Sequence, residues 1–264
     1  MDELIKINYD SDIPTILGRD LHELLEVKTA YKDWFPRMCE YGFTEGVDFN
    51  PLKIERVQME GARYVTREMQ DHQLTIDMAK EICMLQRTEK GKQARQYFIQ
   101  IEADWNSPER VLERARMIED RKRLSIRNEL KTHNKALADA AHDAGVIESR
   151  DYAIFQNRGY QGLYGGMGRK EIHQHKGLKK SQDILDHMGS TELAANLFRA
   201  TQTEEKLRKE QIRGKEQANQ THYEVGAKVR KTMQEISGTL PEDLPTPEKS
   251  IKQIEREQKK LENK

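Results

Sequence analysis

The chain has 264 residues, of which 34% are charged and 36% are hydrophobic, and its formal net charge is zero. Because the charged fraction exceeds the roughly 25% of an ordinary globular domain, we expect long solvated faces rather than one deep core. No segment approaches the ~18 apolar residues of a membrane-spanning helix, and the N-terminus does not resemble a signal peptide. The two cysteines, Cys39 and Cys83, cannot build a disulfide framework, so we expect a soluble intracellular protein.

Charge divides the chain into two parts. Residues 1–105 carry 14 basic and 20 acidic side chains, a net charge of −6, whereas the remaining residues carry 31 and 25, a net charge of +6. This asymmetry predicts two modules with different partners, and the alternative is chance scatter in a charge-rich chain. A DNA-binding N-terminal module would more usually be basic, because phosphate contacts supply most of the non-specific affinity for DNA.

The first module begins with a strand-like pattern and two helical patterns. Ile5 and Ile7 alternate with polar residues, which predicts a short strand, and leucines at helical spacing predict a helix over 17–27. A second apolar pattern over 30–42 would complete a helix-turn-helix-like unit. Pro36 conflicts with that second helix, because proline lacks a backbone donor and should kink it.

The rest of the first module predicts a hairpin followed by two helices. Residues 48–70 carry strand-like runs on either side of Gly61, which is typical of a β-hairpin with its turn at that glycine. Thr75 is suited to cap the helix that follows, and apolar residues at helical spacing predict a second helix over 94–105.

Ser107 and Pro108 together predict a helix start, with a capping hydroxyl followed by proline at the first helical position. The helix should run towards Ala144 and end at Gly145. Its apolar residues do not keep a strict heptad, so it is either a long connector or an irregular partner helix.

The remaining residues are predicted to be mostly helical. Ser190 is suited to cap one helix, and Gly238 to end another. Residues 240–247 contain three prolines and predict a stiff linker, and the charged tail 248–264 should be a solvated helix or disordered. The helices are predicted near 151–157, 169–175, 182–188, 190–211 and 217–236.

The predicted fold class is therefore an α+β N-terminal module followed by a mostly α-helical C-terminal module. The expected divisions are an α+β module at 1–105, a helical connector at 106–148, a helical domain at 149–240 and a linker with a charged tail at 241–264.

The most distinctive segment runs from residue 158 to residue 180. It holds five glycines within 159–168, two tyrosines between them, and six basic side chains against one acidic side chain. Glycines let backbone donors approach an anion, and tyrosines among basic residues suit phosphate contact and base stacking. The alternative is a structural loop whose glycines make tight turns beside a solvated lysine patch. The candidate binding residues here are Arg158, Tyr160, Tyr164, Arg169, Lys170, Lys176, Lys179 and Lys180.

The helix-turn-helix-like segment offers a second candidate surface for a nucleic acid or a protein partner. Its basic residues are Arg19, Lys28, Lys32 and Arg37.

The sequence carries no pattern that predicts catalysis. The glycine-rich segment is not followed by the Lys-Ser/Thr of a nucleotide-binding loop, and no serine stands in a nucleophile elbow. His173, His175 and His187 lack the spacing of a zinc site. We therefore expect no enzyme activity, metal or cofactor.

Two parts of the chain resemble known families. Residues 5–104 resemble the AntA/AntB anti-repressor domain of temperate phages, above all through LTIDMAKE at 74–81 and RTEKGKQARQYF at 87–98. Residues 150–255 resemble the DNA-damage-inducible protein D family, through DYAIFQN at 151–157 and the long match at 186–199. The first resemblance implies inactivation of a phage repressor, and the second implies a role in the DNA-damage (SOS) response.

The expected function is that of a phage- or prophage-encoded anti-repressor acting in the cytoplasm of a bacterial host. One module would bind the repressor stoichiometrically, and an acidic module could compete for the repressor's basic DNA-facing surface. The alternatives are a DNA-binding regulator and a modulator of recombinase–DNA filaments. Partly apolar faces on the helices at 108–144 and 217–237 also predict a homo-oligomer.

Overall fold

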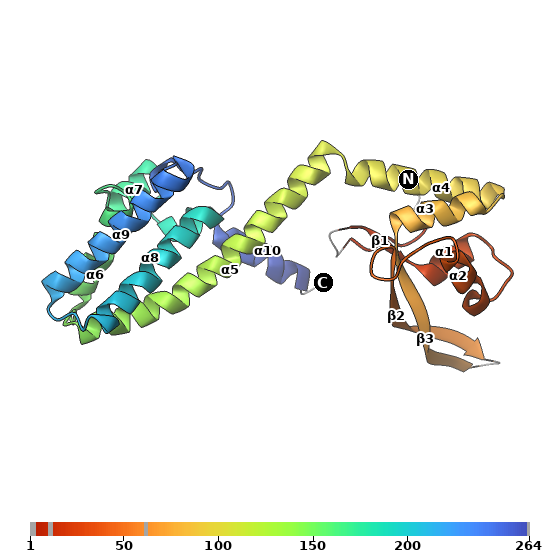
Figure 1. Ribbon diagram of the computed structural model, residues 1–264, viewed down its shortest axis with the longest axis horizontal. Coiled ribbons are helices and arrows are strands. Elements are labelled where there is room, and N and C mark those ends of the chain that lie inside the picture. The colour runs from red at the N-terminus through yellow and green to blue at the C-terminus, as the bar shows by residue number, and fades with distance from the viewer. Residues whose placement is uncertain (1–3, 10–12, 61–62, 263–264) are drawn as a thin grey trace. The chain divides into compact units, whose positions relative to one another are not determined.

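A computed structural model describes the chain apart from residues 1–3, 10–12, 61–62 and 263–264 (Figure 1). The chain forms two compact units, unit 1 at residues 1–113 and unit 2 at residues 114–264. Unit 1 combines helices with a small antiparallel sheet and unit 2 is helical, which confirms the predicted fold class. Within the described residues, no helix combines the length and apolar character needed to cross a membrane.

A three-stranded antiparallel sheet in the order β1-β3-β2 organises unit 1. Its strands are β1 (Thr15–Leu17), β2 (Phe49–Glu60) and β3 (Arg63–Thr75). β2 and β3 pair continuously from one end to the other, which confirms the predicted hairpin. The predicted turn at Gly61 lies outside the described residues. Figure 1 shows this β2–β3 ribbon extending beyond the neighbouring helices.

The predicted strand at Ile5 and Ile7 is wrong. Both side chains are buried in the core of unit 1, but among the described residues the segment pairs with β1 through one isolated bridge, between Asn8 and Thr15. The strand lies instead at Thr15–Leu17, where Ile16 pairs with Leu74 of β3. Alternating apolar residues indicate that every second side chain is buried. An extended segment outside a sheet can bury its side chains in the same way.

The helices of unit 1 pack around one side-chain core, and their order follows the prediction. Helix α2 contains Pro36 and ends three residues later, so it is shorter than the predicted 30–42 segment. Thr75 caps α3 as predicted, and Thr88 caps α4 in the same way, each hydroxyl accepting a backbone hydrogen bond. The bounds are α1 (Gly18–Leu24), α2 (Tyr31–Cys39), α3 (Ile76–Leu85) and α4 (Glu89–Trp105).

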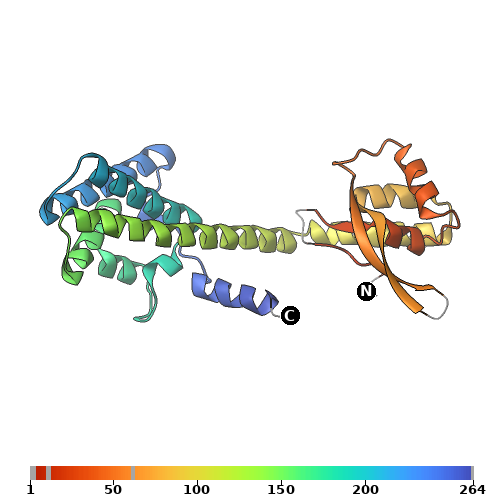
Figure 2. The ribbon, with the colours of Figure 1, turned by 90° about the horizontal axis from the view of Figure 1, so that it is seen from below.

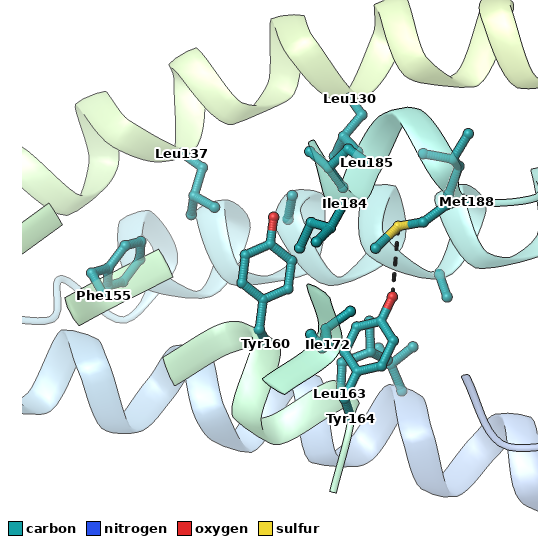
Figure 3. Packing of buried hydrophobic residues seen from close by; sticks show 14 of the residues in the cluster. Leu130, Leu137, Phe155, Tyr160, Leu163, Tyr164, Ile172, Ile184, Leu185 and Met188 are labelled. Carbon is teal, nitrogen blue, oxygen red and sulfur yellow. Dashed lines mark hydrogen bonds between the residues drawn. The ribbon is translucent and has the colours of Figure 1, made fainter. Parts of the chain in front are cut away.

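Unit 2 is a set of packed helices with two short 3-10 turns (Figure 2). Helix α5 begins in unit 1 and ends just before Gly145, as predicted. The core draws side chains from α5, α6, α7, α8 and α9 (Figure 3). The bounds are α5 (Pro108–Asp143), α6 (Ser149–Leu163), α7 (Arg169–His175), η1 (Ile184–His187), α8 (Ser190–Lys209), α9 (Lys215–Ser237), η2 (Pro241–Asp243) and α10 (Ile251–Glu262).

Helix α6 runs through the first part of the glycine-rich segment, so the prediction of a loop there is wrong. A Cβ at Gly162 would lie 2.1 Å from the carbonyl oxygen of Tyr223, and one at Gly226 would lie 2.7 Å from the carbonyl oxygen of Gly159. These glycines therefore let the backbones of α6 and α9 touch, a role that leaves no cradle for an anion.

The predicted cap of α8 is also corrected. Ser190 is the first helical residue, and Gly189 occupies the capping position. Glu119 of α5 takes over the capping function, because its two carboxylate oxygens accept hydrogen bonds from the Ser190 backbone N–H and hydroxyl, each at 2.7 Å. A carboxylate at this place also suits the positive end of the helix dipole.

The predicted linker packs against unit 2, and the tail forms a helix, one of its two predicted alternatives, whose first turn packs against the core while its other described residues are exposed. Arg230 of α9 makes a bidentate ion pair with Glu242 in η2. The buried Arg123 of α5 donates a hydrogen bond of 2.9 Å to the Lys249 carbonyl. Ile251 and Ile254 of α10 are almost fully buried in the core. Two apolar residues one turn apart thus anchor a segment whose composition is otherwise that of a solvated tail.

Candidate partner-binding surfaces

Arg19 holds α1 against β3, and its side chain is half-buried. Its backbone N–H donates to Asp71 Oδ1 at 3.0 Å, and its Nε donates to the Gln70 carbonyl at 2.9 Å. Its guanidinium also lies 4.4 Å from the centre of the Tyr31 ring. Burial, together with the Asp71 charge, raises the pKa of Tyr31, which keeps its hydroxyl protonated beneath this cation.

The other basic residues of the helix-turn-helix-like segment do reach solvent. Lys28, Lys32 and Arg37 are all exposed. However, Asp33 and Glu40 are also exposed on α2 or at its end, so the surface carries both signs of charge. A DNA-reading helix would instead present mostly cations and donors to phosphates, so this surface suits a protein partner better.

The β2–β3 ribbon adds an apolar surface to unit 1. Arg56 of β2 forms ion pairs with Asp20 and Glu23 of α1, which fixes the ribbon to the helices. Further along, Met59 lies directly opposite Tyr64, and these two side chains are 69% and 80% exposed. Large apolar side chains grouped in solvent are typical of a surface that meets another macromolecule.

In unit 2, the ends of several elements bring most of the predicted basic residues together. Asn157 of α6 accepts a hydrogen bond of 2.8 Å from the Arg169 backbone N–H, and His173 lies 3.1 Å from the Lys179 carbonyl. Arg169 also pairs with Asp183 at 2.5 Å, so part of the positive charge is neutralised. We call this the α7 surface; its exposed basic residues are Arg158, Arg169, Lys170, Lys179 and Lys180.

The side chains of three residues predicted for the same surface are buried, which corrects their placement on a binding surface. Tyr160 and Tyr164 lie in the core of unit 2, where Figure 3 shows them among aliphatic side chains. The Lys176 ammonium pairs with the buried Glu192 carboxylate at 2.8 Å. The tyrosines are buried because Tyr160 lies in α6 and Tyr164 is the residue that caps its C-terminal end, so neither lies in the predicted loop.

The Lys176–Glu192 pair belongs to a buried hydrogen-bond network. Tyr164 donates to the other Glu192 oxygen at 2.8 Å, and Asn196 donates to the Tyr164 hydroxyl at 2.9 Å. Burial raises the pKa of Glu192, while the Lys176 charge opposes that effect. Burial and the Glu192 charge raise the pKa of Tyr164, so its hydroxyl remains a donor. The network therefore satisfies polar groups in the core and leaves them unavailable to a partner.

Arg199 and His222 form a second buried polar contact, which the sequence analysis missed. His222 Nδ1 lies 3.0 Å from the Phe155 carbonyl and must donate to it, so Nε2 is the acceptor for Arg199 Nη1. The Arg199 guanidinium lies 4.9 Å from the centre of the Tyr160 ring. Burial and the Arg199 charge hold the pKa of His222 well below its usual value, which keeps the imidazole neutral.

Within the described residues, no group of three or more His, Cys, Asp or Glu side chains could hold a metal ion. Burial raises the pKa of Cys83 to about 12, so its thiol is a core side chain rather than a nucleophile.

Models of two known protein families match residues of the two units. A family model for the DinD C-terminal domain matches residues 117–254, which is more than half of the chain. The chain belongs to the DinD C-terminal domain family. A model for the AntA/AntB antirepressor matches residues 16–88, from β1 to the cap of α4. Both resemblances predicted from the sequence are thereby confirmed.

A curated relative supports the same assignment. DNA damage-inducible protein D of Escherichia coli (strain K12) is 66% identical to this chain over 146 residues. The match covers 55% of this chain and 53% of the relative, so the chain spans about half the length of that protein.

Proposed function

We propose that this DinD-family chain is an antirepressor that acts in response to DNA damage by binding a phage repressor stoichiometrically. The observation that supports this proposal most directly is the AntA/AntB match over residues 16–88, the segment that forms the sheet and helices α1 to α3. The match to DNA damage-inducible protein D supports the link to DNA damage.

Unit 1 would carry the repressor-binding surface. Its α1–α2 surface presents mixed charges, and its ribbon presents exposed apolar side chains. The acidic net charge of residues 1–105 would attract the basic DNA-facing surface of a repressor and would repel DNA itself. The chain would act by occupying that surface, without making or breaking a covalent bond, in the cytoplasm of the bacterial host.

The test combines a cellular and a purified assay. Expression of the full chain in a bacterial lysogen should induce the prophage whose repressor it binds. That purified repressor is then bound to fluorescent operator DNA, and the chain is titrated in while anisotropy is measured. We expect release of the DNA to be complete near equimolar chain and repressor, with no binding of the chain to the DNA alone. Complete release of the DNA by far less than one chain per repressor, together with loss of intact repressor, would instead indicate an enzyme.

A second candidate function is DNA binding through the α7 surface, because five basic side chains remain exposed there. The same titration separates the two functions. A DNA-binding chain would raise the anisotropy of free operator DNA, and its affinity would fall steeply with salt. A modulator of a recombinase filament would act on recombinase-coated single strands and leave the repressor–operator complex intact.

A further inference from the structure

The outer edge of strand β2 has no partner strand among the residues that the structure describes. In the sheet order β1-β3-β2, β3 covers one edge of β2 only. Among the described residues, the outer edge carries a single isolated bridge, between Glu45 and Phe49 at the start of the strand. From Pro51 onward the edge is open, and an open edge is a template for pairing with another strand.

The hydrogen bonds at the base of β2 show which residues face this open edge. The Thr75 N–H donates to the Asp48 carbonyl on the β3 side, whereas the Gly46 N–H donates to the Phe49 carbonyl on the outer side. Because backbone groups alternate along a strand, the odd-numbered residues of β2 direct their N–H and C=O groups outward. Pro51 fits this phase, since a residue without an N–H is tolerated where it faces away from the ladder.

The same odd-numbered residues, whose backbone groups face the open edge, also have exposed side chains. Lys53 is 73% exposed although it pairs with Glu68 across the ribbon, Glu55 is exposed, and Val57 is 65% exposed. A positive charge, a negative charge and an apolar residue therefore follow one another at every second position along an unpaired edge.

We propose that β2 pairs antiparallel with β2 of a second copy of this chain, about a two-fold axis at Ile54. In this register Lys53 lies opposite Glu55 of the second copy, and by symmetry Glu55 lies opposite Lys53. Pro51 lies opposite Val57, an apolar pair in which the Val57 N–H donates to the Pro51 carbonyl while Pro51 has no N–H to donate in return, and Ile54 lies opposite itself. Each of these cross-strand pairs joins opposite charges or two apolar side chains, the combinations that stabilise antiparallel strands. The pairing makes one continuous six-stranded sheet from two three-stranded sheets.

Charge selects this register over its neighbours. An axis at Lys53 would place the two Lys53 ammonium groups opposite each other, and an axis at Glu55 would do the same for two carboxylates. An axis at Arg56 would place Lys53 opposite Met59 and Glu55 opposite Val57, so neither charge would meet an opposite charge. Like charges directly opposite are destabilising, so only the Ile54 axis is self-complementary among these four. A two-fold interface requires such self-complementarity, which favours a second copy over an unrelated strand as the occupant.

Disulfide trapping tests the register in the full-length chain with Cys39→Ser, which removes the partly exposed native thiol. At the proposed axis, the two residues at position 54 form a non-hydrogen-bonded pair with Cα atoms about 4.5 Å apart, a distance that a disulfide tolerates. Ile54→Cys should therefore give a covalent dimer under mild oxidation. Val57→Cys is the matched control, because two residues at position 57 would lie about 20 Å apart, and it should stay monomeric on a non-reducing gel.

A charge exchange tests the same contact without cysteine. Light scattering should show a wild-type dimer that dissociates on dilution. Lys53→Glu and Glu55→Lys should each weaken the dimer about tenfold or more. The variant with both changes should restore the dimer, because each cross-strand pair then joins opposite charges again. Glu68→Gln, which removes only the internal partner of Lys53, should leave the dimer intact.

Three results would overturn the proposal. The first is a wild-type chain that remains monomeric up to about 100 µM. The second is a dimer that neither single charge change weakens, which would place the contact elsewhere, for example on α5. The third is a double exchange that fails to restore the dimer while circular dichroism shows a folded chain.

Discussion

The two units differ in how many charged residues they bury, because unit 1 buries Asp71 whereas unit 2 buries several. Unit 2 draws several of them into its core, where Lys176 pairs with Glu192, Arg199 contacts His222, and Arg123 binds main-chain carbonyls. In unit 1, by contrast, the basic residues of α2 stay in solvent, and the ribbon adds exposed apolar side chains. A charged residue of this chain therefore indicates a binding surface only if its side chain is exposed.

This difference assigns different roles to the units. A buried charge that loses its partner costs several kcal/mol, so the polar residues in the core of unit 2 determine its stability. Exposed residues contribute little to stability and remain available for a partner. The following predictions test this contrast, from the largest expected effect to the smallest.

Removal of Glu192 should have the largest effect. Glu192→Ala leaves Lys176 buried without a counter-charge and should lower the free energy of unfolding of unit 2 by about 3–5 kcal/mol. Far-UV circular dichroism during urea denaturation follows the helices, most of which belong to unit 2. Both tryptophans, Trp34 and Trp105, lie in unit 1, so their fluorescence transition should not move.

Glu205→Ala is the matched control for this experiment, because Glu205 lies on the same helix and is exposed. It should change the stability by less than about 0.5 kcal/mol. Equal effects of the two substitutions would contradict the burial of the Lys176–Glu192 pair.

A methyl group at Gly162 should destabilise unit 2 by about 2–3 kcal/mol, because it would overlap the Tyr223 carbonyl of α9. Gly189→Ala is the control, since its added carbon meets nothing closer than 3.7 Å and alanine at this capping position should cost no more than about 1 kcal/mol. The sign is informative here. Alanine is the better helix former by about 1 kcal/mol, so a Gly162→Ala chain more stable than the wild type would refute close packing of α6 on α9.

Acidification should destabilise unit 2 through His222. The pKa of this buried imidazole is well below 6.5 in the folded chain, so the unfolded chain binds the proton more readily. The stability is therefore fully present above pH ~6.5 and falls by about 1.4 kcal/mol per pH unit below it, until the folded pKa is reached. Denaturation midpoints of unit 2 between pH 8 and pH 5 measure this slope.

His222→Gln should flatten that pH dependence even though it lowers stability at neutral pH. Burial lowers the pKa of His187 as well, so a smaller slope of the same sign should remain. A slope that is unchanged in His222→Gln would assign the pH dependence to other groups.

The smallest effect is expected at the α7 surface. Lys180→Ala should leave the stability within about 0.5 kcal/mol of the wild type, because Lys180 is exposed, whereas Lys176→Ala should destabilise strongly although it lies only four positions away. Thermal denaturation compares the two variants, and similar melting temperatures would contradict the burial of the Lys176 side chain.

Much of the fold could be predicted from the sequence because its signals are local. Thr75 caps α3 through its own hydroxyl, and Gly238 ends α9 in a left-handed conformation that favours glycine. The β2–β3 hairpin follows from residues that are neighbours in the chain. Each of these features depends on residues within a few positions of one another.

The binding residues were harder to predict because their burial depends on residues far away in the sequence. Gly159 and Gly162 look like loop residues until α9, some sixty positions later, packs against them. Lys176 looks solvated until Glu192 of α8 supplies a buried carboxylate. Arg199 and His222 lie in helices of ordinary composition, so only their contact across the core distinguishes them.

Hydrogen–deuterium exchange of the full chain, with and without its repressor, tests the central claim most directly. Unit 1 should carry the partner surface, so bound repressor should slow exchange in α1, α2 and the β2–β3 ribbon, and leave α8 and α9 unchanged. Operator DNA alone should slow exchange nowhere. Protection confined to α7 and residues 176–183, or produced by DNA without repressor, would contradict this account.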